Sequence, residues 1–151
     1  MVWCSVSRTS HQSSGRKESP EEQRSRTMRA VRSKDTSPEL IVRRTLRSLG
    51  FTGYRLHHKR LTGKPDVAFL GRRKAIFVHG CFWHGHDCPR GARIPKSNRD
   101  YWLPKIKRNR ERDKEHVAAL VEQGWSVLTV WECDLRNTEE LADKLRAFMA
   151  Q

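Results

Sequence analysis

The chain has 151 residues, a length that suits one domain with a modest core. Lys and Arg total 31 against 17 Asp and Glu, so the formal net charge is +14. A charge of this size favours a polyanionic partner, and the lack of a long apolar segment argues against a membrane as that partner. Residues 1–20 lack the apolar core of a signal peptide, so we expect a cytoplasmic protein with reduced cysteines.

The N-terminal part of the chain divides into a tail and a basic arm. Residues 1–22 are rich in Ser and other polar residues, which predicts a disordered tail. Near its end, Ser19 and Pro20 have the pattern of a helix N-cap and a first helical residue. Residues 23–36 combine many Arg and Lys with little apolar surface, which predicts either a solvated helix or an arm that orders on DNA. We expect a single domain over residues 23–151.

The remaining chain has alternating helix and strand patterns. Their order is helix, three strands, helix, strand and helix, which predicts an α/β fold. The predicted helices are residues 37–49, 98–123 and 138–149, and the predicted strands are residues 51–58, 65–70, 74–79 and 125–131. Gly50 and Gly124 supply the expected helix stops, and Asn98 or Ser97 the cap of the long helix.

A metal site is predicted in the irregular segment that follows the third strand. Residues 79–88 contain two Cys and three His, and thiolate and imidazole are the ligands that tetrahedral Zn²⁺ prefers. Cys133 ends the next apolar strand and can supply another ligand. We therefore predict a structural zinc site made of Cys81, His86, Cys88 and Cys133. Because the spacing is not that of a standard zinc finger, small buried cysteines beside a surface histidine are the alternative.

Hydrolytic chemistry is suggested by three residues outside that ligand set. His79 and His84 are left over beside the metal, and imidazole exchanges protons near neutral pH. Asp66 is a lone carboxylate entering an apolar strand, where burial is costly unless a partner or a metal such as Mg²⁺ is present. Together they predict a phosphodiester hydrolase, against the alternative of ordinary histidines and a turn aspartate. Glu39 is either a favourable first-turn charge or a hydrogen-bond partner of a catalytic histidine.

Aromatic and basic residues indicate a DNA-binding face. Phe82 and Trp83 lie in a glycine-flanked loop, and Trp102 lies near the start of the long helix. Residues 90–114 hold ten Lys or Arg. Apolar side chains that unstack bases commonly occur beside basic groups that hold phosphates. Core packing of Trp102 and a solvated charged helix face are the alternatives.

Residues 24–149 resemble the very short patch repair (Vsr) family of DNA mismatch endonucleases. The motifs that carry the resemblance are Phe-Val-His-Gly-Cys-Phe-Trp-His at 77–84 with His86 and Cys88, Val-Trp-Glu-Cys at 130–133, Gly-Lys-Pro-Asp at 63–66, Tyr-Trp-Leu at 101–103 and Met-Arg-Ala at 28–30. The resemblance implies a restriction-endonuclease-like (PD-(D/E)xK-type) mixed sheet flanked by helices, with a structural zinc site. It also implies an enzyme that nicks the T-containing strand at T·G mismatches left by deamination of 5-methylcytosine.

The resemblance also implies roles for individual residues. Asp66 would bind the catalytic Mg²⁺ together with the backbone carbonyl of Val78, at a position where the family can have Thr. His84 would be the general base, Glu39 would orient it, and His79 would support the scissile phosphate.

DNA contacts and partners follow from the same resemblance. Phe82, Trp83 and Trp102 would wedge into the duplex beside the mismatch, while Met28 would enter from the other groove and Arg29 would bind DNA from the same arm. The partner is double-stranded DNA carrying a T·G mismatch, with a functional link to a cytosine-5 DNA methyltransferase. One active site that nicks one strand needs only a monomer, and recruitment of a MutL-type repair protein is left open.

Other functions remain as alternatives. A non-catalytic, zinc-stabilised DNA-binding module would keep the zinc ligands and aromatic residues without needing Asp66 or His84. A restriction-type endonuclease would cut both strands. A zinc deaminase is disfavoured because its H-x-E and P-C-x-x-C pattern is absent from the sequence.

Overall fold

The computed structural model describes residues 18–30, 34–94, 96 and 98–151, which divide into two units with a boundary after Ser33. In the first unit, helix α1 (Pro20–Ala30) begins with a reciprocal cap. The Ser19 amide donates to Glu22 Oε2 at 2.8 Å, and the Glu22 amide donates to Ser19 Oγ at 3.2 Å. The helix thus begins inside the segment predicted as a disordered tail, whose residues 1–17 lie outside the described residues.

A four-stranded sheet with the order β1-β2-β3-β4 forms the centre of the second unit. Its strands are β1 (Arg55–Leu56), β2 (Val67–Phe69), β3 (Lys74–His79) and β4 (Ser126–Trp131). The first three strands pair antiparallel, whereas β3 and β4 pair parallel. The sheet is therefore mixed, as predicted.

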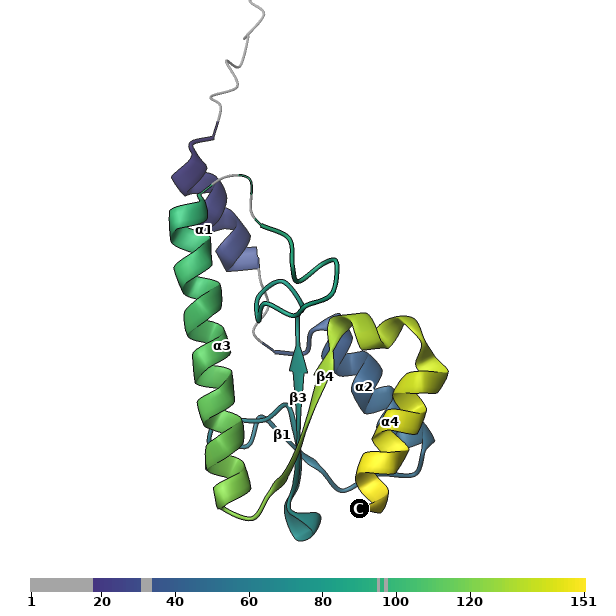
Figure 1. Ribbon diagram of the computed structural model, residues 1–151. Helices are drawn as coiled ribbons and strands as arrows, with labels where there is room; N and C mark the ends of the chain where they lie inside the picture. The colour runs from purple at the N-terminus through teal and green to yellow at the C-terminus, as the bar shows by residue number, and fades with distance from the viewer. Residues whose placement is uncertain (1–17, 31–33, 95, 97) are drawn as a thin grey trace, which may run out of the picture. The chain divides into compact units, whose positions relative to one another are not determined.

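Helices cover both faces of this sheet (Figure 1). Helices α2 (Ser37–Ser48) and α4 (Thr138–Ala150) pack on one face, and the long helix α3 (Arg99–Glu122) covers the other. Two short 3₁₀ turns, η1 (Leu70–Arg72) and η2 (Glu132–Arg136), follow β2 and β4. The predicted α/β fold with a mixed sheet flanked by helices is confirmed. No helix in the described ranges has the length and apolar character needed to cross a bilayer.

The alternation of side chains along β3 decides which residues meet which helix. Ile76 and Val78 contribute to the core beneath α2 and α4, whereas Ala75 and Phe77 contribute to the core beneath α3. Successive side chains of a strand point to opposite faces, so His79 falls on the α3 face. The side chains of Val78 and His79, the last two residues of β3, therefore lie on opposite faces of the sheet.

The first predicted strand is much shorter than expected. Residues 51–58 were expected to be extended, but only Arg55 and Leu56 pair with β2. Phe51 instead closes α2 by donating its amide to the Leu46 carbonyl at 2.9 Å, and Gly53 and His57 adopt positive φ angles of 80° and 45°. These left-handed residues bound the strand on both sides.

Caps and glycines mark the ends of α2 and α3, and the side-chain cap predicted for Asn98 does not form. The Thr36 hydroxyl accepts the Glu39 amide and caps α2. Asn98 precedes α3 in the left-handed region with φ 54°, and its side chain makes no capping bond. Gly50 and Gly124 end α2 and α3 with φ of 82° and 78°, as expected.

We predict that Gly63→Ala destabilises the protein more than Gly53→Ala, although both glycines have positive φ (74° and 80°). A Cβ at Gly53 meets nothing within 4 Å, so this variant should lose only about 1 kcal/mol through backbone strain. A Cβ at Gly63 would lie 2.8 Å from the Cβ of His116, which is fixed on α3, so crowding should raise the loss to roughly 2–4 kcal/mol. Urea denaturation measures both, and equal losses would contradict the predicted contact between this turn and α3.

Candidate active site and metal centre

The four predicted zinc ligands come together at the ends of β3 and β4. His79 and Trp131 are register partners in the parallel pair, and Cys81 and Cys133 each follow two residues later. The segments that leave the two strands are therefore neighbours. One ligand atom from each of Cys81, His86, Cys88 and Cys133 lies within 4.8 Å of the others, so the group could hold a metal ion.

The thiols of this cluster differ in their pKa values. Burial raises the pKa of the Cys81 thiol to about 12, whereas the Gly91 amide, which donates to Cys88 Sγ at 3.4 Å, lowers the pKa of Cys88 to about 6. The Cys133 Sγ atom lies 3.4 Å from His86 Nδ1. A low-pKa thiol packed against further thiols and an imidazole is the donor set of a structural zinc site.

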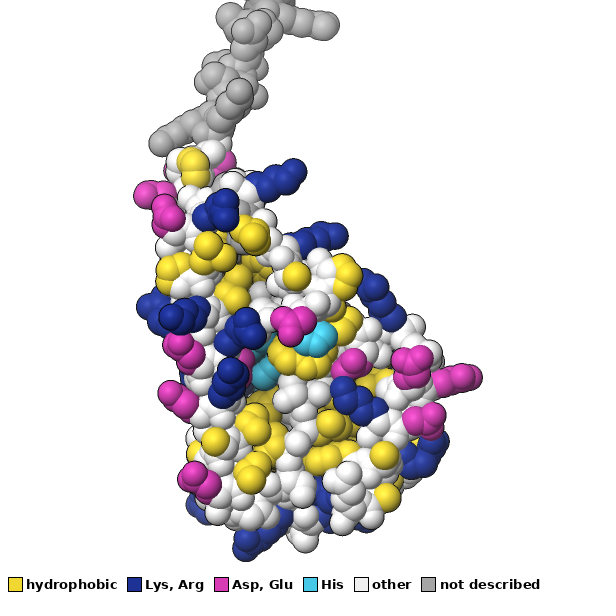
Figure 2. Space-filling model, in the orientation of Figure 1, with side chains coloured by type: hydrophobic (Ala, Val, Ile, Leu, Met, Phe, Trp, Pro, Cys, Tyr) yellow, Lys and Arg dark blue, Asp and Glu magenta, His cyan; other side chains and the backbone are white. Residues whose placement is uncertain are grey.

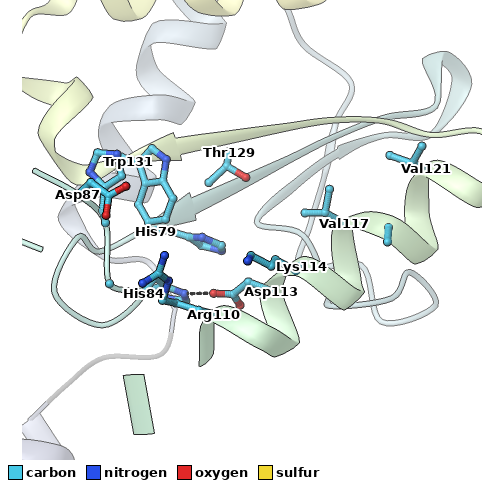
Figure 3. Close-up of a pocket in the computed structure, with 13 residues that line it drawn as sticks. His79, His84, Asp87, Arg110, Asp113, Lys114, Val117, Val121, Thr129 and Trp131 are labelled. Atoms are coloured by element: carbon cyan, nitrogen blue, oxygen red, sulfur yellow. Dashed lines mark hydrogen bonds and ion pairs between the residues drawn. The ribbon is translucent and has the colours of Figure 1, made fainter. Parts of the chain in front are cut away.

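A second cluster lies on the α3 face of the sheet (Figure 3). The ring of His79 stacks on that of His84, with centroids 3.9 Å apart and planes 5° from parallel. His84 Nδ1 makes a short contact with Asp113 Oδ2, and Asp113 is a residue of α3. Because burial lowers the pKa of His79 to about 4, His79 is neutral at pH 7. The carboxylate and the neutral ring hold His84 in place, and its Nε2 atom is then available to exchange a proton.

The two clusters are linked by the loop between them and by α3. Asn109 donates its side-chain amide to the Trp83 carbonyl at 2.9 Å, one helical turn before Asp113. The helix thus holds the loop at two points, at Trp83 and at His84. A pocket of about 480 Å³ opens beside the histidines, and its lining includes Arg110, Lys114 and Trp131.

Asp66 lies at the same end of the sheet, on the α2 side. Its Oδ2 accepts the Val78 amide at 2.7 Å, and its side chain is 18% exposed. Burial raises the pKa of Asp66 to about 6, although the bond from Val78 opposes that shift. His57 bridges two carboxylates, with Nδ1 3.6 Å from Asp66 Oδ1 and Nε2 3.3 Å from Glu39 Oε2. A desolvated carboxylate of this kind is stabilised by a bound cation.

Glu39 has different partners from the one predicted. It accepts bonds from Arg43, which follows it by four residues on α2, and from the Asp35 amide. His84 is paired with Asp113 instead. The physical reason is local, because Arg43 is only 4% exposed and a buried guanidinium needs nearby carboxylates. In this structure, therefore, Asp113 rather than Glu39 orients His84.

The predicted aromatic wedge is a packed cluster. Trp102 is only 9% exposed, and its ring meets those of Phe82 and Trp83 edge-on at centroid distances of 6.2 and 5.5 Å. Phe82 and Trp83 are half-buried rather than fully exposed. The backbones of Met28 and Arg29 lie in α1, and their side chains are outside the described residues.

Exposed basic side chains lie along α3. Figure 2 shows Lys and Arg side chains gathered over α3, beside a histidine near the middle of the visible face. The exposed basic residues of α3 include Lys107, Arg108, Arg110, Arg112 and Lys114. Such a surface attracts phosphates by displacing their counterions.

Sequence reasoning missed three residues of these clusters. Asp113 lies in a highly charged helix, where nothing in the pattern separates it from a solvated carboxylate. Arg43 carries a charge within the apolar stripe of α2, between Val42 and Leu46, and that misplaced charge was the available signal. His57 comes just after a short strand and is recognisable only from the fold.

Comparisons with known proteins agree with the site. Residues 18–90 match the family model described as DNA mismatch endonuclease Vsr. The chain is 52% identical to the type II nicking enzyme V.XorIIP of Xanthomonas oryzae pv. oryzae, over 83% of this chain and 90% of that protein. It is 43% identical to the type II nicking enzyme V.NmeAIP of Neisseria meningitidis, over 85% and 90% of the two chains. It is 41% identical to the DNA mismatch endonuclease Vsr of Escherichia coli, over 80% and 76%.

We predict that Asp66→Asn stabilises the metal-free protein at pH 7, by up to about 3 kcal/mol. The pKa of Asp66 is raised to about 6 in the folded protein, so the folded state binds this proton more tightly than the unfolded chain. Wild-type stability should therefore fall as pH rises from about 4 to about 6, and the variant should lack that fall.

Urea denaturation of both proteins between pH 4 and 7 measures the difference. Asp143→Asn is the control, because the Asp143 side chain is 75% exposed. Identical pH profiles for wild type and Asp66→Asn would mean that this carboxyl group is not desolvated in the folded protein.

Proposed function

Because the chain belongs to the Vsr family of DNA mismatch endonucleases, we propose that it nicks the T-containing strand at a T·G mismatch in double-stranded DNA. A nicking DNA endonuclease is the function of the family, and the mismatch is the more specific part of the proposal. The observation that supports it most strongly is the meeting of the Asp66 carboxylate and the His79–His84–Asp113 cluster at one end of β3.

Asp66 is the proposed ligand of a catalytic Mg²⁺, together with the backbone carbonyl of Val78. The fit is supported by the half-buried carboxylate, whose raised pKa reflects a charge that lacks solvation. When bound, the ion would polarise the scissile phosphate and neutralise its developing charge. Because the role of Val78 uses only its main chain, valine serves there as well as threonine.

His84 is the proposed general base. Asp113 would accept a hydrogen bond from Nδ1–H of His84, which would leave the lone pair on Nε2 to take a proton from water. In serine hydrolases a carboxylate fixes the tautomer and the orientation of the catalytic histidine in the same way. His79 is neutral and stacked on His84, so it fixes the ring from the other side and supports the phosphate.

A structural zinc ion bound by Cys81, His86, Cys88 and Cys133 completes the proposed site. Its ligands come from the segments that follow β3 and β4, so the metal would hold the loop that carries His84 against the sheet.

Mismatch recognition is assigned to the aromatic cluster. Phe82, Trp83 and Trp102 contact one another, so they would enter the duplex as one group. Prying apart a weakly paired T·G site costs less than prying apart a matched pair, and this difference favours the mismatch. Met28 and Arg29 are proposed to contact DNA from the opposite groove.

The cellular setting is proposed from the chemistry of the site. Reduced thiols and a DNA substrate fit the cytoplasm. The T·G mismatch implies a functional link to a cytosine-5 DNA methyltransferase, and a MutL-type repair protein is a candidate partner. One active site is sufficient for one nick, so a monomer is the proposed active form.

We predict a Mg²⁺-dependent nick in the T strand of an end-labelled duplex carrying one T·G mismatch. The matched control is the same duplex with a C·G pair, and both are incubated with Mg²⁺ and with EDTA. Asp66→Asn should abolish the nick in every condition. Cutting of both strands in both duplexes would identify a restriction-type endonuclease, and tight binding without cutting in several sequence contexts would identify a DNA-binding module.

We also predict that Asp113→Asn lowers the single-turnover nicking rate at least about 100-fold, because the amide no longer fixes the tautomer of His84. Duplex affinity should change little. Glu111→Gln is the control, since its carboxylate is exposed on the same helix and pairs only weakly with Lys107 at 3.9 Å. A rate for Asp113→Asn equal to that of Glu111→Gln would remove Asp113 from the mechanism.

A further inference from the structure

The acidic cluster beside Asp66 contains a set of donors that resembles a second metal site. Asp35, Glu39 and His57 each offer a ligand atom, and these atoms lie within 4.8 Å of one another. Two carboxylates and an imidazole suit divalent cations such as Mn²⁺. His57 connects the set to Asp66, because its two ring nitrogens face Glu39 and Asp66.

A guanidinium group already lies among these donors. Arg43 Nη1 donates to Asp35 Oδ1 at 2.5 Å, Arg43 Nη2 donates to Glu39 Oε2 at 2.8 Å, and the same Nη2 lies 3.2 Å from His57 Nε2. One side chain thus contacts all three donors.

The position of Arg43 is not that of a surface ion pair. Its side chain is only 5% exposed, and its Nε atom has no hydrogen-bond partner among the described residues. A guanidinium group keeps its charge at any physiological pH, so this cation cannot leave the cluster by losing a proton. Its burial is stabilised by the neighbouring carboxylates, which in turn hold it in place.

We propose that Arg43 is a resident cation of the catalytic cluster. It takes the position that a second divalent ion would hold among Asp35, Glu39 and His57, so the cluster binds a single divalent ion, at Asp66. Two-metal nucleases place their ions about 3.5–4 Å apart, and here a fixed guanidinium supplies the second positive charge. The inference rests on the proposed metal-dependent function of Asp66.

Removing the guanidinium should open the second site. Arg43→Met keeps the side chain unbranched but removes the guanidinium group. Two carboxylates and an imidazole are then left without their cation. We expect the zinc-loaded full chain to bind one Mn²⁺ in the wild type and two in Arg43→Met, measured by isothermal titration calorimetry and by the Mn²⁺ electron paramagnetic resonance signal. Asp66→Asn should remove the wild-type ion. Arg44→Met, which changes the adjacent exposed arginine, should still bind one.

Two further variants keep the test decisive if Arg43→Met does not fold, which circular dichroism reveals. Arg43→Lys retains the charge and should bind one Mn²⁺. Arg43→Gln removes the charge while keeping a polar side chain that can still hydrogen-bond Glu39, and it should bind two Mn²⁺. Two ions in the wild type or in Arg43→Lys, or one ion in a folded Arg43→Met or Arg43→Gln, would overturn the inference.

The test is separable from that of the proposed function, because Mn²⁺ binding is measured without DNA. A wild type that binds one Mn²⁺ at Asp66 but does not nick mismatched duplexes would contradict the function and leave the role of Arg43 intact. A wild type that nicks mismatched duplexes but binds two Mn²⁺ ions would support the function and contradict the role of Arg43.

Discussion

The parallel pairing of β3 with β4 is the constraint on which the rest of the site depends. In its register His79 lies opposite Trp131, so the segments leaving the two strands begin side by side. That arrangement brings Cys133 to Cys81 across a long stretch of sequence, and it leaves the intervening α3 to cover one face. A shift by one residue would turn each side chain of β4 to the opposite face and would separate the cysteines.

The end of β3 joins two kinds of chemistry. Val78 belongs to the α2 side, where its amide binds Asp66, and His79 belongs to the α3 side, where it stacks on His84. In the proposed mechanism the acidic half would hold positive charge, and the histidine half would move a proton. Because Val78 and His79 are consecutive, the acidic cluster and the histidine cluster both lie near the end of β3. They share no side chain. Trp83 of the aromatic cluster precedes His84 in the chain, and α3, which carries Asp113, also carries exposed basic residues.

Much of the fold was predictable because local pattern and tertiary packing agree. The bounds of β3 and the stops at Gly50 and Gly124 follow from apolar runs and left-handed glycines. The meeting of Cys81, His86, Cys88 and Cys133 was predictable because thiol and imidazole side chains clustered in sequence are typical of a metal site. The extent of β1 was not, because the left-handed backbone of His57, a non-glycine residue, ends the strand early. The partners of Glu39 and His84 were not predictable either, since Asp113 and Arg43 look in sequence like ordinary charges on helices.

We propose that the Asp66 cluster and the His84 cluster form one active site acting on one phosphate. A crystal structure of the wild-type chain with a T·G duplex and Ca²⁺, which fills oxygen sites, tests it directly. We expect the scissile phosphate to lie against a cation held by Asp66, with His84 Nε2 within hydrogen-bonding distance of the attacking water. A phosphate bound at only one of the two clusters, with the other facing solvent or protein, would contradict it.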